Sequence, residues 1–401
     1  MFRTEYSKMV AVLCKTFGLS HIEIAEDVVS ETFLKAAETW GIKGIPENPV
    51  AWLYQVAKNS TKDIFKRQQI FDSKIVPEYT SATDFINSEF DFSEDNINDS
   101  LLQMIFVVCH PKLSVDSQIA LALRILFGFG IDEICSALLA NKETINKRLL
   151  RAKNTLRDNR IELESVSEVE IEARLNSVLA VLYLLFNEGY FASTATMKIR
   201  KDLCFDALRL THLLTKIKIT SLPEVNALLA LFCFQASRFE SRTNQSGEQI
   251  LYDQQNTDGW DFELIERGNY YLSLSRNSTH LSKYLLEAMI AFWHTQRFMD
   301  EEMKWNNILQ LYNRLLQKQY SPIVALNRTY ALSKVKGRDE ALKEALKIKL
   351  ESNPLYHTLL SELYSGIDDH KKNEHLENAI QLTKNQSDIT VIKGKFNKRT
   401  D

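Results

Sequence analysis

Apolar residues recur at three- and four-residue spacing through long stretches of this chain, and alternating strand-like patterns are nearly absent. Because an α-helix repeats about every 3.6 residues, this spacing places one apolar stripe on each helix. Glycine (12) and proline (7) are scarce among the 401 residues, so few positions interrupt the pattern. The sequence therefore predicts an all-α protein.

The periodic segments fall into blocks. Residues 71–100 hold eight acidic residues and one basic residue, a composition typical of a flexible linker. We therefore expect a helical block at 1–70, an acidic linker at 71–100, a second helical block at 101–160 and a long helical region at 170–385.

Charge and cysteine content exclude several classes of protein. The formal net charge is -3, so any nucleic-acid contact must come from local basic faces. Five cysteines without a CxxC pair indicate reduced thiols and no zinc site. The longest apolar run, 227–234, is too short for a membrane span, and the N-terminus lacks a signal-peptide layout. We expect a cytoplasmic protein that binds neither membrane nor metal and carries no cofactor.

The C-terminal region shows an internal repeat. A shift of 34 residues places Leu326 on Leu360, and four further positions fall in the same register; these pairs are Tyr330 and Tyr364, Leu342 and Leu376, Ala345 and Ala379, and Ile348 and Leu382. Phe292, Ile308 and Tyr312 form a weaker third copy. This period is that of the tetratricopeptide helix–turn–helix unit, which buries its apolar face by stacking on its neighbours. The alternative is coincidence among Leu- and Ala-rich helices.

The stretch "IDEICSALLANKETINKRLLRAKNTLR" (131–157) predicts a helix–turn–helix. Ile145, Leu149, Ala152 and Leu156 form the inner stripe of its second helix. Its outer face and first turn offer DNA-contact candidates, because a recognition helix places N-terminal residues against bases and basic flanks against phosphates. These candidates are Lys142, Glu143, Thr144, Lys147, Arg148 and Arg151. A solvated basic face is the alternative, and Leu150 also points outward.

The stretch "PENPVAWLYQVAKNSTKDIFKRQ" (46–68) predicts a second basic helix. Leu53, Val56, Ala57, Ser60 and Ile64 form its inner stripe, and the opposite face carries Lys58, Asn59, Lys62 and Lys66. Basic residues interleaved with aromatic rings suit single-stranded DNA. We favour the alternative for the rings, that Trp52 and Phe65 belong to the core.

The segment "AEDVVSETFLKAAETW" (25–40) has an apolar stripe and a charged far face. Val29, Phe33, Ala36 and Trp40 make the stripe, and the far face carries Asp27, Glu31, Lys35 and Glu38. An acidic face is unsuited to DNA, so it is either solvated or docks on a protein.

These segments, in this order, resemble the sigma-70 family, specifically the extracytoplasmic-function sigma factors. The first two are similar to region 2, which docks on RNA polymerase and opens and reads the −10 element. Residues 131–157 are similar to region 4, which reads the −35 element. "LQMIFVVCHPKLSVDSQIALALR" and "VLAVLYLLFNEGYFAS" are similar to a subgroup with a C-terminal tetratricopeptide-like extension.

The resemblance implies roles for individual residues. Asp27, Glu31 and Lys35 would contact the clamp of core RNA polymerase, and Ser30 stands where the family often has Gln. The loop at 41–49, with Lys43 and Asn48, would hold a flipped base of the −10 element. Residues 1–160 hold 19 basic and 21 acidic residues, so the free chain should bind DNA poorly and need polymerase.

The extension carries candidates for a regulatory contact in "FNEGYF" (186–191) and "NTDGWDFELIERG" (256–268). These are Asn187, Glu188, Tyr190, Asp258, Trp260 and Asp261. The alternative is that the two aspartates cap the following helix. We expect the extension to regulate the sigma module in cis or to bind a peptide or protein partner.

Three other functions compete. A stand-alone helix–turn–helix regulator explains 131–157 but leaves 25–67 unexplained. A pure tetratricopeptide scaffold explains residues 290–385 but gives the basic helices no role. An enzyme is least expected, because the chain has no GxGxxG, P-loop, HExxH or GxSxG motif, and His370 and His375 share no helix face suited to metal.

Overall fold

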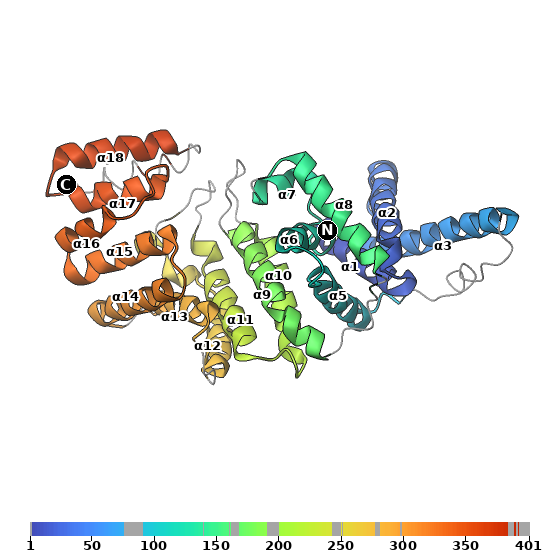
Figure 1. The fold of residues 1–401 in the computed structure, drawn as a ribbon, viewed down its shortest axis with the longest axis horizontal. Helices are drawn as coiled ribbons and strands as arrows, with labels where there is room; N and C mark the ends of the chain where they lie inside the picture. The colour runs from blue at the N-terminus through green and yellow to red at the C-terminus, as the bar shows by residue number, and fades with distance from the viewer. Residues whose placement is uncertain are drawn as a thin grey trace. The chain divides into compact units, whose positions relative to one another are not determined.

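The computed structural model describes residues 2–75, 91–138, 140–159, 161, 168–190, 200–242, 250, 252–276, 281–296, 299–383, 389 and 392. Over these residues the regular structure is helical, with no strand (Figure 1), so the all-α prediction is confirmed. None of the helices in this part of the chain has the length and apolar character that a membrane crossing requires.

The chain forms two compact units and passes between them more than once. The first unit comprises Met1–Glu188 and Phe205–Thr220, and the second comprises Gly189–Cys204 and Ser221–Asp401. The first unit therefore continues well past residue 160, where the sequence suggested that the second helical block ends.

The first unit begins with four helical elements: α1 (Phe2–Phe17), the short 3₁₀ helix η1 (Leu19–His21), α2 (Ile22–Lys43) and α3 (Pro49–Ile75). Every side chain from Met9 to Cys14 is fully buried, so α1 is the central helix of this unit. Gly18, at φ 83°, lets the chain turn between α1 and η1. Pro49 opens α3, where its fixed φ suits the first turn.

Four further helices complete the segment up to residue 158: α5 (Glu94–Val108), α6 (Val115–Ile125), α7 (Ile131–Ala137) and α8 (Lys142–Asp158). Side chains of Ser93, Ser114 and Asn141 cap α5, α6 and α8. The first turns of α5 lie within the range expected to be a linker, and residues 76–90 of that range lie outside the described residues.

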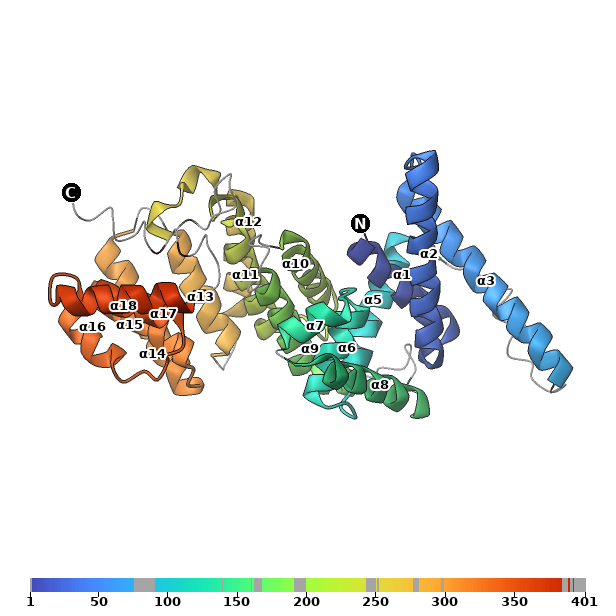
Figure 2. The ribbon, with the colours of Figure 1, turned by 90° about the horizontal axis from the view of Figure 1, so that it is seen from above.

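The two predicted sequence blocks pack into one body. The central helix α1 contacts α2, α5 and α6, and α8 packs on η1 (Figures 1 and 2). Helix α9 (Glu168–Tyr190) is attached to this body, because the buried Arg174 donates a hydrogen bond of 3.1 Å to the carbonyl of Phe106. Helix α10 (Lys201–Lys216) contributes Arg209, which donates to Asn98 Oδ1 at 3.1 Å.

The second unit is a succession of helices: α11 (Pro223–Ala236), α12 (Phe262–Ser275), α13 (Lys283–Thr295), α14 (Glu301–Lys318), α15 (Pro322–Lys336), α16 (Arg338–Ala345), α17 (Pro354–Tyr364) and α18 (Asp369–Leu382). The 3₁₀ turns η2 (Phe239–Ser241), η3 (Tyr252–Gln254) and η4 (Thr257–Gly259) join α11 to α12. From α13 onward each helix packs on the next, as in a stack of helical hairpins.

Several of the positions paired by the 34-residue shift are buried. Leu326 and Leu360 are both buried, and Ala345 and Ala379 are both fully buried. Ile348 is buried, whereas its counterpart Leu382 is 36% exposed at the end of the last helix. Helices α17 and α18 are followed by no further hairpin among the described residues that could cover Leu382.

Candidate nucleic-acid interface

Helix α8 has the amphipathic structure that its sequence predicts. Ile145, Leu149, Ala152 and Leu156 are all at most 6% exposed, which confirms the inner stripe. Asn141 begins the helix, and its side chain accepts a hydrogen bond of 2.8 Å from the Thr144 backbone N–H. Helix α8 packs on α6 and α7.

The outer face of α8 is open to solvent. Lys142, Lys147 and Arg151 are exposed, as is Glu143. Lys147 pairs with Glu143 at 2.6 Å and Lys142 with Asp132 at 2.7 Å. The hydrogen bond to Asp132 and its charge raise the pKa of Lys142. Exposed pairs of this kind are worth little, so DNA phosphates can replace the local carboxylates.

A groove of about 290 Å³ lies beside this face, at the start of α6. Arg148 and Arg151 of α8 line it together with Lys112, and Arg148 pairs with Asp116 at 2.6 Å. The groove also contains the beginning of α6, where the positive end of the helix dipole favours an anion. Ser114, Ser117 and Thr155 complete the polar lining.

The sequence prediction missed Lys112 and the two serines. The pattern Ser114–Val115–Asp116–Ser117, a serine directly before an apolar periodic segment, indicates a helix start and could have identified them.

Helix α3 presents the second set of predicted DNA contacts. Leu53 and Ala57 are fully buried, Ser60 is buried, and Val56 and Ile64 are partly buried. On the opposite face Asn59 and Lys66 are exposed, and Lys58 and Lys62 are partly exposed. Asn59 Oδ1 accepts a hydrogen bond of 3.1 Å from Gln55. The structure thus aligns these four side chains along one helix.

The aromatic residues near this face are engaged within the chain. Trp52 packs edge-on against Trp40, with ring centroids 5.4 Å apart. Tyr54 stacks on Phe92 at 4.4 Å and donates a hydrogen bond to Glu5. The favoured interpretation of Trp52 as a packed residue is therefore supported, and the side chain of Phe65 lies outside the described residues.

The expected loop at 41–49 begins only after Lys43, which is the last residue of α2, and both Lys43 and Asn48 are exposed. Asn48 Oδ1 accepts a hydrogen bond of 3.0 Å from the Ala51 backbone N–H, so this side chain caps α3. Capping occupies the oxygen of Asn48 and leaves its amide N–H₂ group as the donor available to a base.

The acidic face of α2 is open. Asp27 and Glu31 are exposed one turn apart, and Lys35 forms an ion pair of 2.8 Å with Glu31. Lys35 also donates to Ser60 Oγ of α3 at 3.2 Å, which ties the two helices together. The exposed Leu34 and Ile42 lie on the same helix. An exposed face that mixes acids with large apolar residues is suited to a protein partner.

The structure also brings α2 and α8 into contact, which the sequence did not suggest. Glu26 of α2 is 5% exposed and accepts hydrogen bonds from Lys153 of α8 and from Arg124 of α6. The predicted contact residues of α3 and α8 remain on separate helices.

In the second unit, parts of both predicted regulatory segments contact residues 237–242. The buried Tyr190 has the guanidinium of Arg242 over its ring at 3.8 Å and packs on Phe239 of η2. From the other segment, the Asp261 backbone N–H donates to the carbonyl of Ser237 at 2.8 Å. Trp260 is buried. Asp258 begins no α-helix, but Asp261 Oδ1 accepts from the Leu264 N–H at 3.0 Å, so Asp261 caps α12 as the alternative interpretation expects.

Glu188 and Asn187 lie at the end of α9 within the first unit, and both are partly buried. Burial and the nearby carboxylate of Glu133 raise the pKa of Glu188. Glu133 itself accepts a hydrogen bond from the Gly130 N–H at 2.8 Å, which starts α7.

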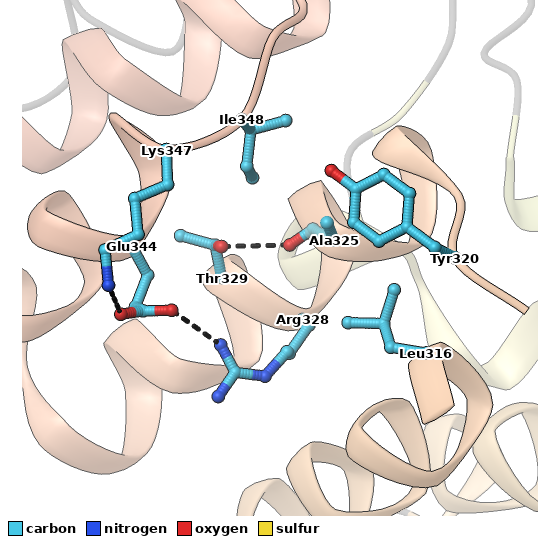
Figure 3. Close-up of a pocket in the computed structure, with 8 residues that line it drawn as sticks. All are labelled: Leu316, Tyr320, Ala325, Arg328, Thr329, Glu344, Lys347 and Ile348. Atoms are coloured by element: carbon cyan, nitrogen blue, oxygen red, sulfur yellow. Dashed lines mark hydrogen bonds and ion pairs between the residues drawn. The ribbon is translucent and has the colours of Figure 1, made fainter. Parts of the chain in front are cut away.

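The repeat region offers a groove of about 370 Å³ between α14, α15 and α16 (Figure 3). Leu316, Ala325 and Ile348 supply apolar walls, and Tyr320 is 64% exposed at its edge. Arg328 and Lys347 approach opposite oxygens of Glu344, at 3.5 and 2.5 Å. Two cations thus share one carboxylate in a partly apolar groove, a setting suited to a peptide that carries an acidic group.

Two segments of the chain match known protein families, and one known protein is similar over nearly the whole chain. Residues 2–70 match a family described as "Sigma-70 region 2", and residues 174–276 match a "Family of unknown function (DUF6596)". An uncharacterized protein of Rhizobium meliloti (strain 1021) is 31% identical over 378 residues, which are 93% of this chain and 89% of that protein. No solved structure matches the chain.

The region 2 match covers α1, η1, α2 and most of α3, the elements that carry the acidic face and the first basic helix. A sigma-70 region 2 supports a role in transcription initiation, with core RNA polymerase and promoter DNA as partners. The N-terminal region is therefore similar to sigma-70 region 2, and over nearly its whole length the chain belongs to the same family as the Rhizobium protein.

Proposed function

We propose that this chain is a cytoplasmic RNA polymerase sigma factor that directs promoter-specific initiation and carries a C-terminal regulatory extension. In this proposal residues 1–70 bind core polymerase through Asp27, Glu31 and Lys35. Lys58, Asn59, Lys62 and Lys66 of α3 then hold the non-template strand of the −10 element. The observation that carries the proposal is the match of residues 2–70 to sigma-70 region 2.

Residues 101–160 bind the −35 duplex in this proposal. The first turns of α8 enter the major groove with Lys142, Glu143 and Thr144 toward base edges, and Lys147 contacts a backbone phosphate. The groove beside Arg148 and Arg151 receives a backbone phosphate, helped by Lys112 and the start of α6. Support comes from the exposure of this face and from the buried stripe behind it.

The C-terminal extension regulates the sigma module or binds a protein partner in this proposal. Two features support a binding role: the stacked helical hairpins, and the groove with Arg328 and Lys347. Tetratricopeptide-like stacking would make the groove one of a series along the repeats.

Transcription in vitro tests the proposal directly. Purified chain and core polymerase are mixed with fragments of genomic DNA, and transcript start sites are mapped. We expect new, promoter-specific starts that require both components. Tight and specific duplex binding by the chain alone in a gel shift, without any effect on polymerase, would identify a stand-alone helix–turn–helix regulator and contradict the proposal.

A further inference from the structure

One arginine in the groove between α14, α15 and α16 has unused hydrogen-bond donors (Figure 3). Arg328 Nε donates to Asn313 Oδ1 of α14 at 2.6 Å, which fixes the plane of the guanidinium. Its Nη1 is 3.5 Å from Glu344 Oε2, at the outer limit of a hydrogen bond, and Nη2 has no acceptor among the described residues. The side chain is 24% exposed. Arg328 can therefore bind a carboxylate from outside through its two Nη groups.

Glu344 balances only part of the positive charge in this groove. Its other oxygen accepts a hydrogen bond from Lys347 Nζ at 2.5 Å. The hydrogen bond from Lys347 and the charges of Lys347 and Arg328 lower the pKa of Glu344, so this carboxylate stays ionised. One carboxylate thus faces two cations. A second carboxylate can replace the long contact to Arg328 while Glu344 stays paired with Lys347.

The rest of the groove is apolar and small. Its volume of about 370 Å³ lies near the lower end of the range for ligand pockets, so it holds a few side chains and not a folded domain. Leu316, Ala325 and Ile348 form its apolar wall, and Ile348 is buried. A ligand that fits this groove therefore carries an apolar side chain close to its carboxylate.

Large apolar side chains are exposed where one helical hairpin leads into the next. Tyr320 and Ile323, at the connection from α14 to α15, are 64% and 41% exposed. Leu346 and Leu355, at the connection from α16 to α17, are 56% and 60% exposed. Both connections join the second helix of one hairpin to the first helix of the next, so they lie along the same edge of the stack. Exposed apolar residues gathered beside a groove indicate a site for a protein partner.

The same two connections are positively charged. Residues 317–322 and 346–353 contain three exposed lysines and a single carboxylate, namely Lys318, Lys347, Lys349 and Glu351. Positive charge selects an acidic partner. The exposed apolar residues disfavour a nucleic acid, because its phosphate backbone offers no apolar surface to cover them. An acidic peptide that also carries apolar side chains fits both properties of this edge.

We propose that the groove and this edge bind an extended peptide of another protein, in which a carboxylate side chain is followed closely by a large apolar one. The peptide carboxylate binds Arg328, and the apolar side chain lies against Leu316 and Ile348. Further apolar residues of the peptide cover Tyr320 and its neighbours on the edge. This inference rests on the proposed binding role of the extension and names the chemistry of its ligand.

Selection from a displayed library of random peptides tests the proposal, with the purified full chain as the target. Enriched peptides are synthesised with a fluorophore and titrated by fluorescence polarisation. We expect them to share an Asp or Glu close to a large apolar residue. Arg328→Gln should weaken their binding by about tenfold or more, because it removes a charge-assisted hydrogen bond. Tyr320→Ala should weaken it by a smaller factor.

Glu344→Gln separates a binding role from a structural one. It removes the carboxylate that competes for Arg328, so it should tighten peptide binding, whereas loss of a purely structural contact would not. Lys343→Gln is the matched control, because Lys343 is exposed on the same helix and pairs with Glu340 at 3.3 Å. Its affinity for the peptides should equal that of the wild type. Circular dichroism verifies that every variant keeps its helical content.

An empty selection, enriched peptides without a carboxylate, or affinities that Arg328→Gln and Tyr320→Ala leave unchanged would overturn the proposal. A concentration-dependent dimer of the chain that Tyr320→Ala dissociates would also overturn it, because a second copy would then occupy the edge. The proposed sigma function fails separately. A wild-type chain that binds these peptides but does not direct initiation with core polymerase keeps the binding site and loses that function.

Discussion

Lys147 and Arg151 occupy the part of α8 where a side chain can reach DNA without disturbing the core. Both are exposed, and Lys147 pairs with the nearby Glu143. We expect Lys147→Gln to weaken promoter binding by the polymerase complex and to lower the slope of log affinity against log salt by about one, as the loss of one phosphate contact does. Filter binding at several salt concentrations measures this.

The control for that change is Arg157→Gln at the other end of α8, where Arg157 contacts Asp158 and Asn154. Its slope should equal that of the wild type. An unchanged slope for both Lys147→Gln and Arg151→Gln would contradict the assignment of α8 to the −35 duplex.

His294 of α13 gives the second unit a pH-dependent stability. Burial, together with the charges of Arg238 and Lys304, lowers the pKa of this imidazole to about 3, and its Nδ1 has no hydrogen-bond partner among the described residues. In the folded chain this imidazole therefore stays neutral at pH values where the unfolded chain binds a proton, which it does near pH 6.5. Proton binding then stabilises the unfolded chain, so the free energy of unfolding falls as the pH drops below about 6.5.

We expect the free energy of unfolding of the second unit to fall by about 2 kcal/mol between pH 7 and pH 5 because of His294 alone. Urea unfolding of the full chain at both pH values measures it, compared with His294→Gln, which should show a smaller pH difference. His370→Gln, at an exposed position, is the control and should behave as the wild type. Equal pH dependence in all three chains would show that His294 remains protonatable in the fold.

At the scale of the helix, α8 offers two adjacent leucines with opposite surroundings. Leu149 is 6% exposed and Leu150 is 55% exposed. Leu149→Ala should destabilise the first unit by about 2–5 kcal/mol, because it removes buried methyl groups and leaves a cavity. Leu150→Ala should change the stability by less than about 0.5 kcal/mol.

Chemical denaturation followed by circular dichroism distinguishes the two variants. Comparable losses would mean that Leu150 is covered by another part of the molecule. A stable Leu150→Ala variant that loses transcription instead would mean that this side chain contacts DNA or polymerase.

Helices of this kind were predictable because the three- and four-residue spacing of their apolar residues is visible within a short stretch of sequence. The second helix predicted within 131–157 corresponds to α8, Lys142–Asp158, and all four stripe residues are buried. The first helix of this stretch is α7, Ile131–Ala137, and it ends at the C-cap Leu138. A local pattern gives the element and its inner face within a residue or two of its ends.

Contacts between distant elements were not predictable in the same way. Glu26 lies 98 residues from Arg124 and 127 from Lys153, and a glutamate in an amphipathic segment is normally solvated. The groove at the start of α6 likewise needs α8 folded beside it. Ion pairs between residues far apart in the chain leave no repeating pattern in the sequence, so one sequence alone does not reveal them.

At the scale of the whole chain, the division into two units decides where a truncation is informative. A chain ending near residue 165 loses α9 and α10, whose Arg174 and Arg209 bind α5. We expect that truncation to lower the thermal midpoint of the first unit by several degrees, because a buried guanidinium contact and the helices around it are lost.

A chain ending after Thr220 retains every segment of the first unit. If the extension regulates the sigma module, this truncation should change promoter-specific transcription or core affinity while the thermal midpoint of the first unit stays within about 2 °C. Transcription in vitro with the two truncations and the full chain measures both. Unchanged activity and affinity after removal of residues 221–401 would contradict regulation in cis.

The passage of the chain from the first unit to the second at Gly189, back at Phe205 and out again at Ser221 bears on how the protein is made. The first unit can complete its folding only after residue 220 has left the ribosome. At that point Gly189–Cys204 has already been synthesised, whereas the rest of the second unit, from Ser221 onward, has not. Nascent chains stalled shortly before that point should be readily degraded by protease, and swapping the tail between relatives should succeed only when the junction lies beyond α10.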